Sequence, residues 1–165
     1  MNLLYRNNVA SAESLLSLCR EKGLTLATAE SCTGGMIGTT LTSIPGSSDI
    51  FLGGIISYAN SAKESLLGVS NKTLAAHGAV SAETAEEMAK GAVKALGATI
   101  AVSVTGIAGP GGQTNEKPVG LVYFGVATQD SVMTGKRHFS GSRESIRLKA
   151  VAAALALLEE TANTL

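Results

Sequence analysis

Short apolar segments alternate with segments of helical periodicity along nearly the whole chain, and glycines stand at many of the junctions. This alternation constrains the fold most, because β and α elements that follow one another in sequence pack as layers of helices against a sheet. We predict a single α/β layered domain over residues 1–165, with a mixed, mostly parallel sheet flanked by helices on both faces. The expected strands are Leu24–Glu30, Phe51–Tyr58, Ala98–Val104, Val119–Thr128 and Ser131–Phe139, the last two as a hairpin.

Five or six helices are predicted from the spacing of apolar residues and from the residues that begin or end a helix. Asn60, Ser81 and Ser142 are suited to cap the helices that follow them, and Gly23 and Gly97 are suited to end helices. The expected helices are Val9–Glu21, Thr33–Ser43, Ser61–Leu67, Ser81–Leu96 and Ser142–Thr161, with a further helical turn or two at Asn71–His77.

Composition argues against several classes of partner. Thirteen basic and 13 acidic residues give a formal net charge of zero, which does not fit a nucleic-acid-binding or polybasic membrane-binding surface. Only two cysteines, Cys19 and Cys32, and no signal-peptide pattern point to a cytoplasmic setting. No cofactor is expected, and the isolated His77 and His138 argue against a metal site. The last helix is apolar over much of its circumference at Ala150–Leu158, which predicts a homodimer.

The segment Ala29–Gly35 carries the first candidate for chemistry. Ser31 ends a predicted strand just before a glycine-rich helix start, a geometry that exposes its Oγ. The backbone N–H groups of Thr33, Gly34 and Gly35 are candidates to stabilise an oxyanion. Two alternatives stay open, in which Ser31 only caps the helix or Cys32 is the nucleophile.

A second candidate is Lys63, at the start of the helix that Asn60 is expected to cap. The helix dipole disfavours a cation there and lowers the pKa of the lysine, so that it can serve as a general base. A solvated surface lysine is the alternative. Tyr58 and Lys63 do not have the Tyr-x-x-x-Lys spacing of short-chain dehydrogenases, and the chain lacks their glycine motif.

Two further segments complete the pattern. The loop Thr105–Gly112 lacks the lysine of a phosphate-binding P-loop, so it is interpreted either as a wall of a small-molecule pocket or as an ordinary loop. The segment from 136 to 149 contains five Lys or Arg residues and only one acidic residue. Arg143 lies at the start of the last predicted helix, where the helix dipole favours an anion. This cluster predicts either a phosphate site or a solvated rim.

These segments, in this order, resemble the CinA C-terminal-domain family, the nicotinamide-nucleotide amidases. The resemblance covers about residues 9 to 160. Its matching stretches are AESCTGG (29–35), GGIISYANSAK (53–63), GAVSAETAEEMAKG (78–91), VTGIAGPGG (104–112), KPVGLVYFGV (117–126) and FSGSRESIR (139–147). Family members often have Gly-Asp-Arg where this chain has Gly141-Ser142-Arg143, which we interpret as a change of helix cap. Many members carry an additional N-terminal domain of the molybdopterin-binding type, and its activity is not expected of this chain.

The resemblance implies hydrolysis of the carboxamide of nicotinamide mononucleotide to nicotinate mononucleotide and ammonia, without a metal or other cofactor. It implies a catalytic Ser31, Lys63 and Tyr58, with either Lys63 or Tyr58 as the immediate base. It also implies substrate contacts from Thr105 and the loop after it, and from Arg143. The remaining substrate-binding residues that we expect are Asn60, Gly106, Gly109 and Arg147. The alternative from another class is a regulatory module that binds a pyridine nucleotide without catalysis.

Overall fold

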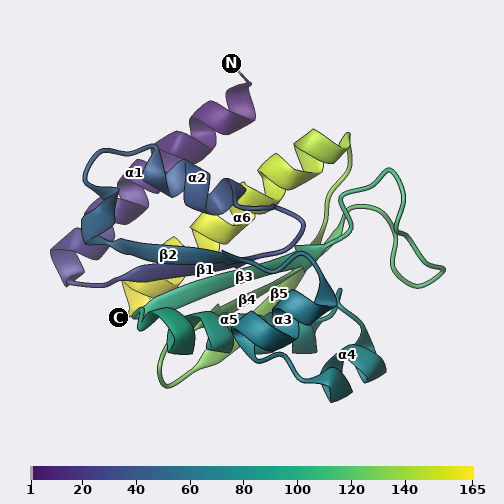
Figure 1. Cartoon of the computed structure of the whole chain (residues 1–165). Helices are drawn as coiled ribbons and strands as arrows, with labels where there is room; N and C mark the ends of the chain where they lie inside the picture. Colours follow the sequence, from purple (N-terminus) through teal and green to yellow (C-terminus); the bar gives the residue numbers. More distant parts are fainter. Residues whose placement is uncertain (1) are drawn as a thin grey trace.

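Five strands form one sheet in the computed structural model, which describes residues 2–165 (Figure 1). Their bounds are Leu26–Glu30 (β1), Phe51–Ile56 (β2), Ile100–Gly106 (β3), Leu121–Ala127 (β4) and Val132–His138 (β5). In the order β2-β1-β3-β4-β5, the pairs of β1 with β2 and β3 are parallel, and those of β4 with β3 and β5 are antiparallel. Within residues 2–165, four of the five strands thus run in one direction, which confirms the mixed, mostly parallel sheet.

Helices cover both faces of this sheet, as predicted. In Figure 1, α1, α2 and α6 lie on one face and α3, α4 and α5 lie on the other. The helices are Leu3–Lys22 (α1), Met36–Thr42 (α2), Asn60–Leu67 (α3), Asn71–His77 (α4), Ala82–Leu96 (α5) and Arg143–Thr164 (α6), with a short 3-10 helix at Ser47–Asp49 (η1). In the part of the chain that the structure describes, no helix is long and apolar enough to cross a membrane.

Most helix ends lie where the sequence predicts them. Gly23 and Gly97 adopt left-handed conformations, with φ of 67° in both, and end α1 and α5. The hydroxyls of Ser81 and Ser142 accept the N–H of the third residue of α5 and α6. The cap predicted at Asn60 is wrong, because Asn60 is already the first residue of α3 and Ala59 precedes it with no side-chain cap.

Three other predicted elements differ from the structure. Helix α1 begins at Leu3 and not at Val9, because Asn2 caps it and accepts the N–H of Leu4. Helix α2 begins at Met36, since the two glycines before it take left-handed conformations. Strand β2 is not apolar on two buried faces: it is an edge strand whose side chains alternate between half-buried and exposed.

The alanine-rich part of α6 is covered by the chain itself. Helix α6 packs along α1 and against β3 and β4, and its buried side chains include Val151, Leu155 and Leu158. Apolar residues on several sides of the helix therefore meet partners within one chain. The homodimer stays a prediction, but this helix does not support it.

Candidate active site

A cavity of about 290 Å³ opens beyond the carboxyl ends of β1, β2 and β3. Crevices at this edge of an open α/β sheet are the usual place for a ligand. Segments far apart in sequence meet here, because each follows one of the parallel strands or packs against that edge. The side chains that line the cavity include Ser31, Cys32, Tyr58, Lys63, Thr105 and Arg143.

Ser31 and Lys63 are in direct contact in this cavity. Ser31 follows β1, and its N–H donates to the carbonyl of Val104 at 2.9 Å. Lys63 comes from the first half of α3, and its Nζ lies 3.1 Å from Ser31 Oγ. The Lys63 side chain is buried, with 1% of the residue exposed, so it is not a solvated surface lysine.

The surroundings of Lys63 suit a neutral amine. Burial lowers the pKa of Lys63 from its ordinary value of 10.5, and the nearby Cys32 thiol opposes this. The Nζ donates to the carbonyl of Ser57 at 2.7 Å and to that of Tyr58 at 3.4 Å. A neutral amine has two N–H bonds for these two carbonyls and one lone pair, which is then free to accept the proton of Ser31.

Cys32 is a poor rival for the role of nucleophile. Burial raises the pKa of its thiol to about 11, and the nearby Arg147 and Lys63 offset this only partly. The attacking species of a cysteine is the thiolate, which is scarce at neutral pH when the pKa is this high. The 3.1 Å contact of Lys63 with Ser31 Oγ and the raised pKa of the Cys32 thiol together favour Ser31 over Cys32 as the candidate nucleophile.

The glycines after Ser31 do not offer free N–H groups, contrary to the sequence prediction. Gly34 N–H donates to the carbonyl of Ser31 at 3.0 Å, and Gly35 N–H donates to a carboxylate oxygen of Glu30 at 3.0 Å. An oxyanion would have to displace these bonds. Within residues 2–165, by contrast, the N–H groups of Cys32 and Thr33 have no hydrogen-bond acceptor.

Tyr58 and Arg143 meet at the rim of the cavity. The hydroxyl of Tyr58 accepts from Nη2 of Arg143 at 3.0 Å, and Nη1 donates to the carbonyl of Gly109 at 2.7 Å. Tyr58 is 62% exposed, and it meets Lys63 through its backbone carbonyl. The contact between Lys63 and Ser31 is direct, so a proton transfer between them needs no relay through the Tyr58 hydroxyl.

Two residues expected to bind substrate lie outside the lining of this cavity. Asn60 is exposed at the start of α3. The guanidinium of Arg147 is engaged with the backbone, where Nε donates to the carbonyl of Cys32 at 3.0 Å and Nη2 to that of Thr33 at 2.9 Å. Neither side chain lines this cavity, and a substrate contact from either residue stays a prediction.

The glycine-rich loop after β3 forms one wall, and residues 79–80 form another. Gly106 and Gly109 line the cavity, and Gly109 has a left-handed φ of 78°. Thr105 is buried, and its hydroxyl donates to the carbonyl of Ala79 at 2.7 Å. Thr105 thus connects the two walls. Its hydroxyl proton is used in this bond and is not available to a ligand.

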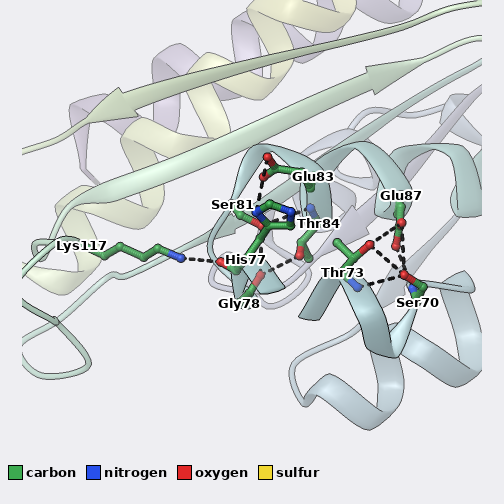
Figure 2. A network of polar contacts seen from close by, with 9 residues as sticks. All are labelled: Ser70, Thr73, His77, Gly78, Ser81, Glu83, Thr84, Glu87 and Lys117. Atoms are coloured by element: carbon green, nitrogen blue, oxygen red, sulfur yellow. Dashed lines mark hydrogen bonds and ion pairs between the residues drawn. The ribbon is translucent and has the colours of Figure 1, made fainter. Parts of the chain in front are cut away.

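A polar network holds the turn between α4 and α5 in place (Figure 2). Lys117, in the connection from β3 to β4 that begins with the glycine-rich loop, donates to the carbonyl of His77 at 2.6 Å. The hydroxyls of Ser81 and Thr84 donate to the carbonyl of Gly78 at 3.0 and 2.7 Å. The wall at residues 79–80 is therefore tied to the loop on one side and to α5 on the other.

Sequence reasoning missed Glu30 and the wall at residues 79–80. Glu30 is the last residue of β1, directly before Ser31, and alternate residues of a strand point to opposite faces. The side chain of Glu30 therefore points away from that of Ser31. A carboxylate at this position in the sequence is a signal for a charged group behind the backbone that follows Ser31. The wall left no such signal, since Ala79 and Val80 are ordinary apolar residues.

Comparison with known proteins gives consistent matches over almost the whole chain. A family model described as the CinA C-terminal domain matches residues 8–162. A competence-damage inducible protein of Clostridium acetobutylicum is 52% identical over 153 residues, which are 92% of this chain. The crystal structure of the competence/damage inducible protein CihA from Agrobacterium tumefaciens is 42% identical, with a TM-score of 0.93 and 99% of both chains covered.

A second solved structure, a CinA superfamily protein from Klebsiella pneumoniae, has a TM-score of 0.92 and 31% identity. It covers 96% of this chain and 99% of its own. The chain spans only 37% of the length of the curated Clostridium relative. The match to that relative is therefore a match to one part of it.

Proposed function

The chain belongs to the CinA C-terminal-domain family, and on that premise we propose that it is an amidohydrolase that deamidates nicotinamide mononucleotide. The products are nicotinate mononucleotide and ammonia. The observation that carries the proposal is the 3.1 Å contact between Ser31 Oγ and the buried Nζ of Lys63 in a cavity open to a small ligand. The family resemblance supplies the identity of the amide.

The reaction begins with attack of Ser31 Oγ on the carboxamide carbon. Lys63 Nζ accepts the hydroxyl proton as the new C–O bond forms, which gives a tetrahedral intermediate. Lys63 then returns that proton to the amide nitrogen, the C–N bond breaks and ammonia leaves. Water, activated by the same amine, hydrolyses the acyl ester on Ser31 and releases the carboxylate.

The oxyanion of the intermediate needs donors that are not already engaged. The N–H of Cys32 is the one we propose first, since the residue after the nucleophile supplies such a donor in other serine hydrolases. The N–H of Thr33, predicted from the sequence, remains the second candidate. Both groups lack an acceptor within residues 2–165, which supports this assignment.

Arg143 is proposed to bind the 5′-phosphate at the rim of the cavity. Its bonds to Gly109 and Tyr58 fix the guanidinium but use only two of its five N–H groups. The remaining N–H groups can donate to phosphate oxygens. Binding energy from this remote group positions the carboxamide at Ser31.

Arg143→Ala is expected to weaken activity on nicotinamide mononucleotide by about ten- to a hundredfold, through a higher KM. Activity on nicotinamide riboside, which has no phosphate, should change little. Steady-state ammonia release on both substrates measures the difference. Equal losses of activity on the two substrates would show that Arg143 holds the shape of the rim through Tyr58 and Gly109 and does not bind the phosphate.

Chelators are expected to leave the activity unchanged. Within residues 2–165, no group of three or more His, Cys, Asp or Glu side chains is placed to hold a metal ion. Ammonia release should therefore be the same before and after dialysis against EDTA. Loss in EDTA with recovery on adding a divalent ion would contradict the Ser–Lys mechanism.

The proposal as a whole is tested with a panel of amides. Purified protein is incubated with nicotinamide mononucleotide, nicotinamide riboside, nicotinamide and NAD, and ammonia is measured in each case. We expect the mononucleotide to be the best substrate, because it alone combines a single phosphate for Arg143 with the carboxamide. A better rate on nicotinamide itself would contradict the role given to the rim.

A further inference from the structure

The segment that carries Ser31 is held from behind by the buried carboxylate of Glu30. Oε2 of Glu30 accepts the N–H groups of Gly35 at 3.0 Å and Ile37 at 3.1 Å, and Oε1 accepts that of Gly38 at 2.9 Å. The Thr28 hydroxyl donates to Oε1 at 3.3 Å. Glu30 is 1% exposed, so these bonds are shielded from water.

The same segment is held on its carbonyl side by Arg147 from α6. The guanidinium donates to the carbonyls of Cys32 and Thr33, which follow the nucleophile directly. The backbone from Ser31 to Gly38 is therefore fixed by one acidic and one basic side chain, each acting on groups of opposite polarity.

Planarity of the peptide bond links Arg147 to the Thr33 N–H, the second candidate for the oxyanion donor. The carbonyl of Cys32 and the N–H of Thr33 belong to one trans peptide plane and point in opposite directions. When Arg147 holds that carbonyl, it also sets the direction of the Thr33 N–H. The orientation of this candidate donor is thus set by a side chain that does not line the cavity.

We propose that Glu30 and Arg147 are positioning residues that hold Ser31 Oγ against Lys63 and aim the neighbouring N–H groups. This inference rests on the proposed function in taking Ser31 as the nucleophile. It also assigns Arg147 a task different from phosphate binding, although Arg147 lies one helical turn after Arg143 in α6.

Glu30→Gln keeps the shape of the side chain but turns one acceptor oxygen into an NH₂ donor. Either Gly38 N–H, or both Gly35 and Ile37 N–H, then face a donor and lose their bonds. Arg147→Lys keeps the charge but lacks the planar fork that reaches two carbonyls. Each variant is expected to lower kcat about a hundredfold, because a displacement near 1 Å at the reacting atoms has that effect.

The readout that separates positioning from phosphate binding is the pair of substrates with and without a phosphate. Positioning predicts the same fall in kcat on nicotinamide mononucleotide and on the riboside, with KM within about threefold of wild type. A loss confined to KM on the mononucleotide would overturn the assignment of Arg147. Wild-type kcat in both variants would overturn the whole inference.

A matched control is Asn8→Ala, whose side chain donates to the carbonyl of Leu148, the residue next to Arg147. It removes a buried bond to α6 without touching the serine segment, so its Tm should fall while kcat stays at the wild-type level. If Glu30→Gln does not fold, Arg147→Lys alone decides. If kcat falls as much in Asn8→Ala as in Arg147→Lys, the loss reflects a general destabilisation of the fold. That result would contradict a positioning role for Arg147.

Labelling of Ser31 by a fluorophosphonate keeps this test separate from the test of the proposed function. The reagent forms an O–P bond to Ser31 Oγ with loss of fluoride, and it needs no carboxamide substrate. If wild type releases no ammonia, the proposed function fails, and slower labelling of both variants still supports the positioning role. Unchanged labelling rates, or no labelling of wild-type Ser31, would overturn it.

Discussion

Replacing Ser31 by alanine is expected to abolish ammonia release from nicotinamide mononucleotide. The loss should be at least about a thousandfold, as for removal of the nucleophile in serine hydrolases. Ser31 is almost buried, and alanine occupies less space, so the fold and the affinity for the nucleotide should be retained. Turnover and calorimetric binding of the same preparation measure the two effects.

Cys32→Ala is the matched control for this variant. It shortens the residue next to Ser31 by a similar volume. In the wild type, burial raises the pKa of the Cys32 thiol to about 11, so this thiol is protonated at neutral pH and the variant removes no nucleophile. The variant should keep most of the activity, and the backbone N–H of residue 32 remains. Residual activity in Ser31→Ala together with loss in Cys32→Ala would move the nucleophile to the cysteine.

The second large effect is expected at Lys63. Lys63→Arg keeps a long basic side chain, but arginine does not lose its proton at accessible pH, so kcat should fall by at least about a thousandfold. Because arginine is larger than the site, Lys63→Met is the companion variant, with an unbranched apolar side chain and no base. Circular dichroism shows whether each variant is folded when its activity is measured.

The pH dependence of the wild type reports on the same group. Burial lowers the pKa of Lys63, and below that pKa the amine is charged and cannot accept the proton of Ser31. The value of kcat/KM should therefore rise with pH and level off above the lowered pKa, at a pH under 10.5. A flat profile, or normal turnover in Lys63→Arg, would make the lysine an electrostatic group and assign the base to Tyr58 or water.

Much of the fold follows from local signals in the sequence. Gly23 and Gly97 end helices because they take left-handed conformations easily, and Ser81 and Ser142 begin helices because their hydroxyls accept a free N–H. The exposure of strand β2 does not follow from such signals, since its apolar residues resemble those of a buried strand. Its place at the edge depends on strand order, which no local pattern encodes.

In the candidate site, too, some residues follow from local signals in the sequence and others depend on contacts between distant segments. Ser31, Lys63 and Arg143 were identified by residue type and by their place at the end of a strand or the start of a helix. The contacts of Arg147 with the backbone carbonyls of Cys32 and Thr33 were not foreseen, because they join positions 114 and more residues apart. Glu30 was missed because the glycine-rich turn looked like a site for an external anion, and the protein's own carboxylate occupies it.

We propose that this cavity performs hydrolysis and does not only bind a nucleotide. The most direct measurement combines calorimetric binding of nicotinamide mononucleotide with the amounts of ammonia and nicotinate mononucleotide formed by the same protein. We predict binding by wild type and Ser31→Ala alike, with the two products formed in equal amounts by wild type alone. Binding by wild type with no product would contradict the claim and identify the domain as a pyridine-nucleotide-binding module.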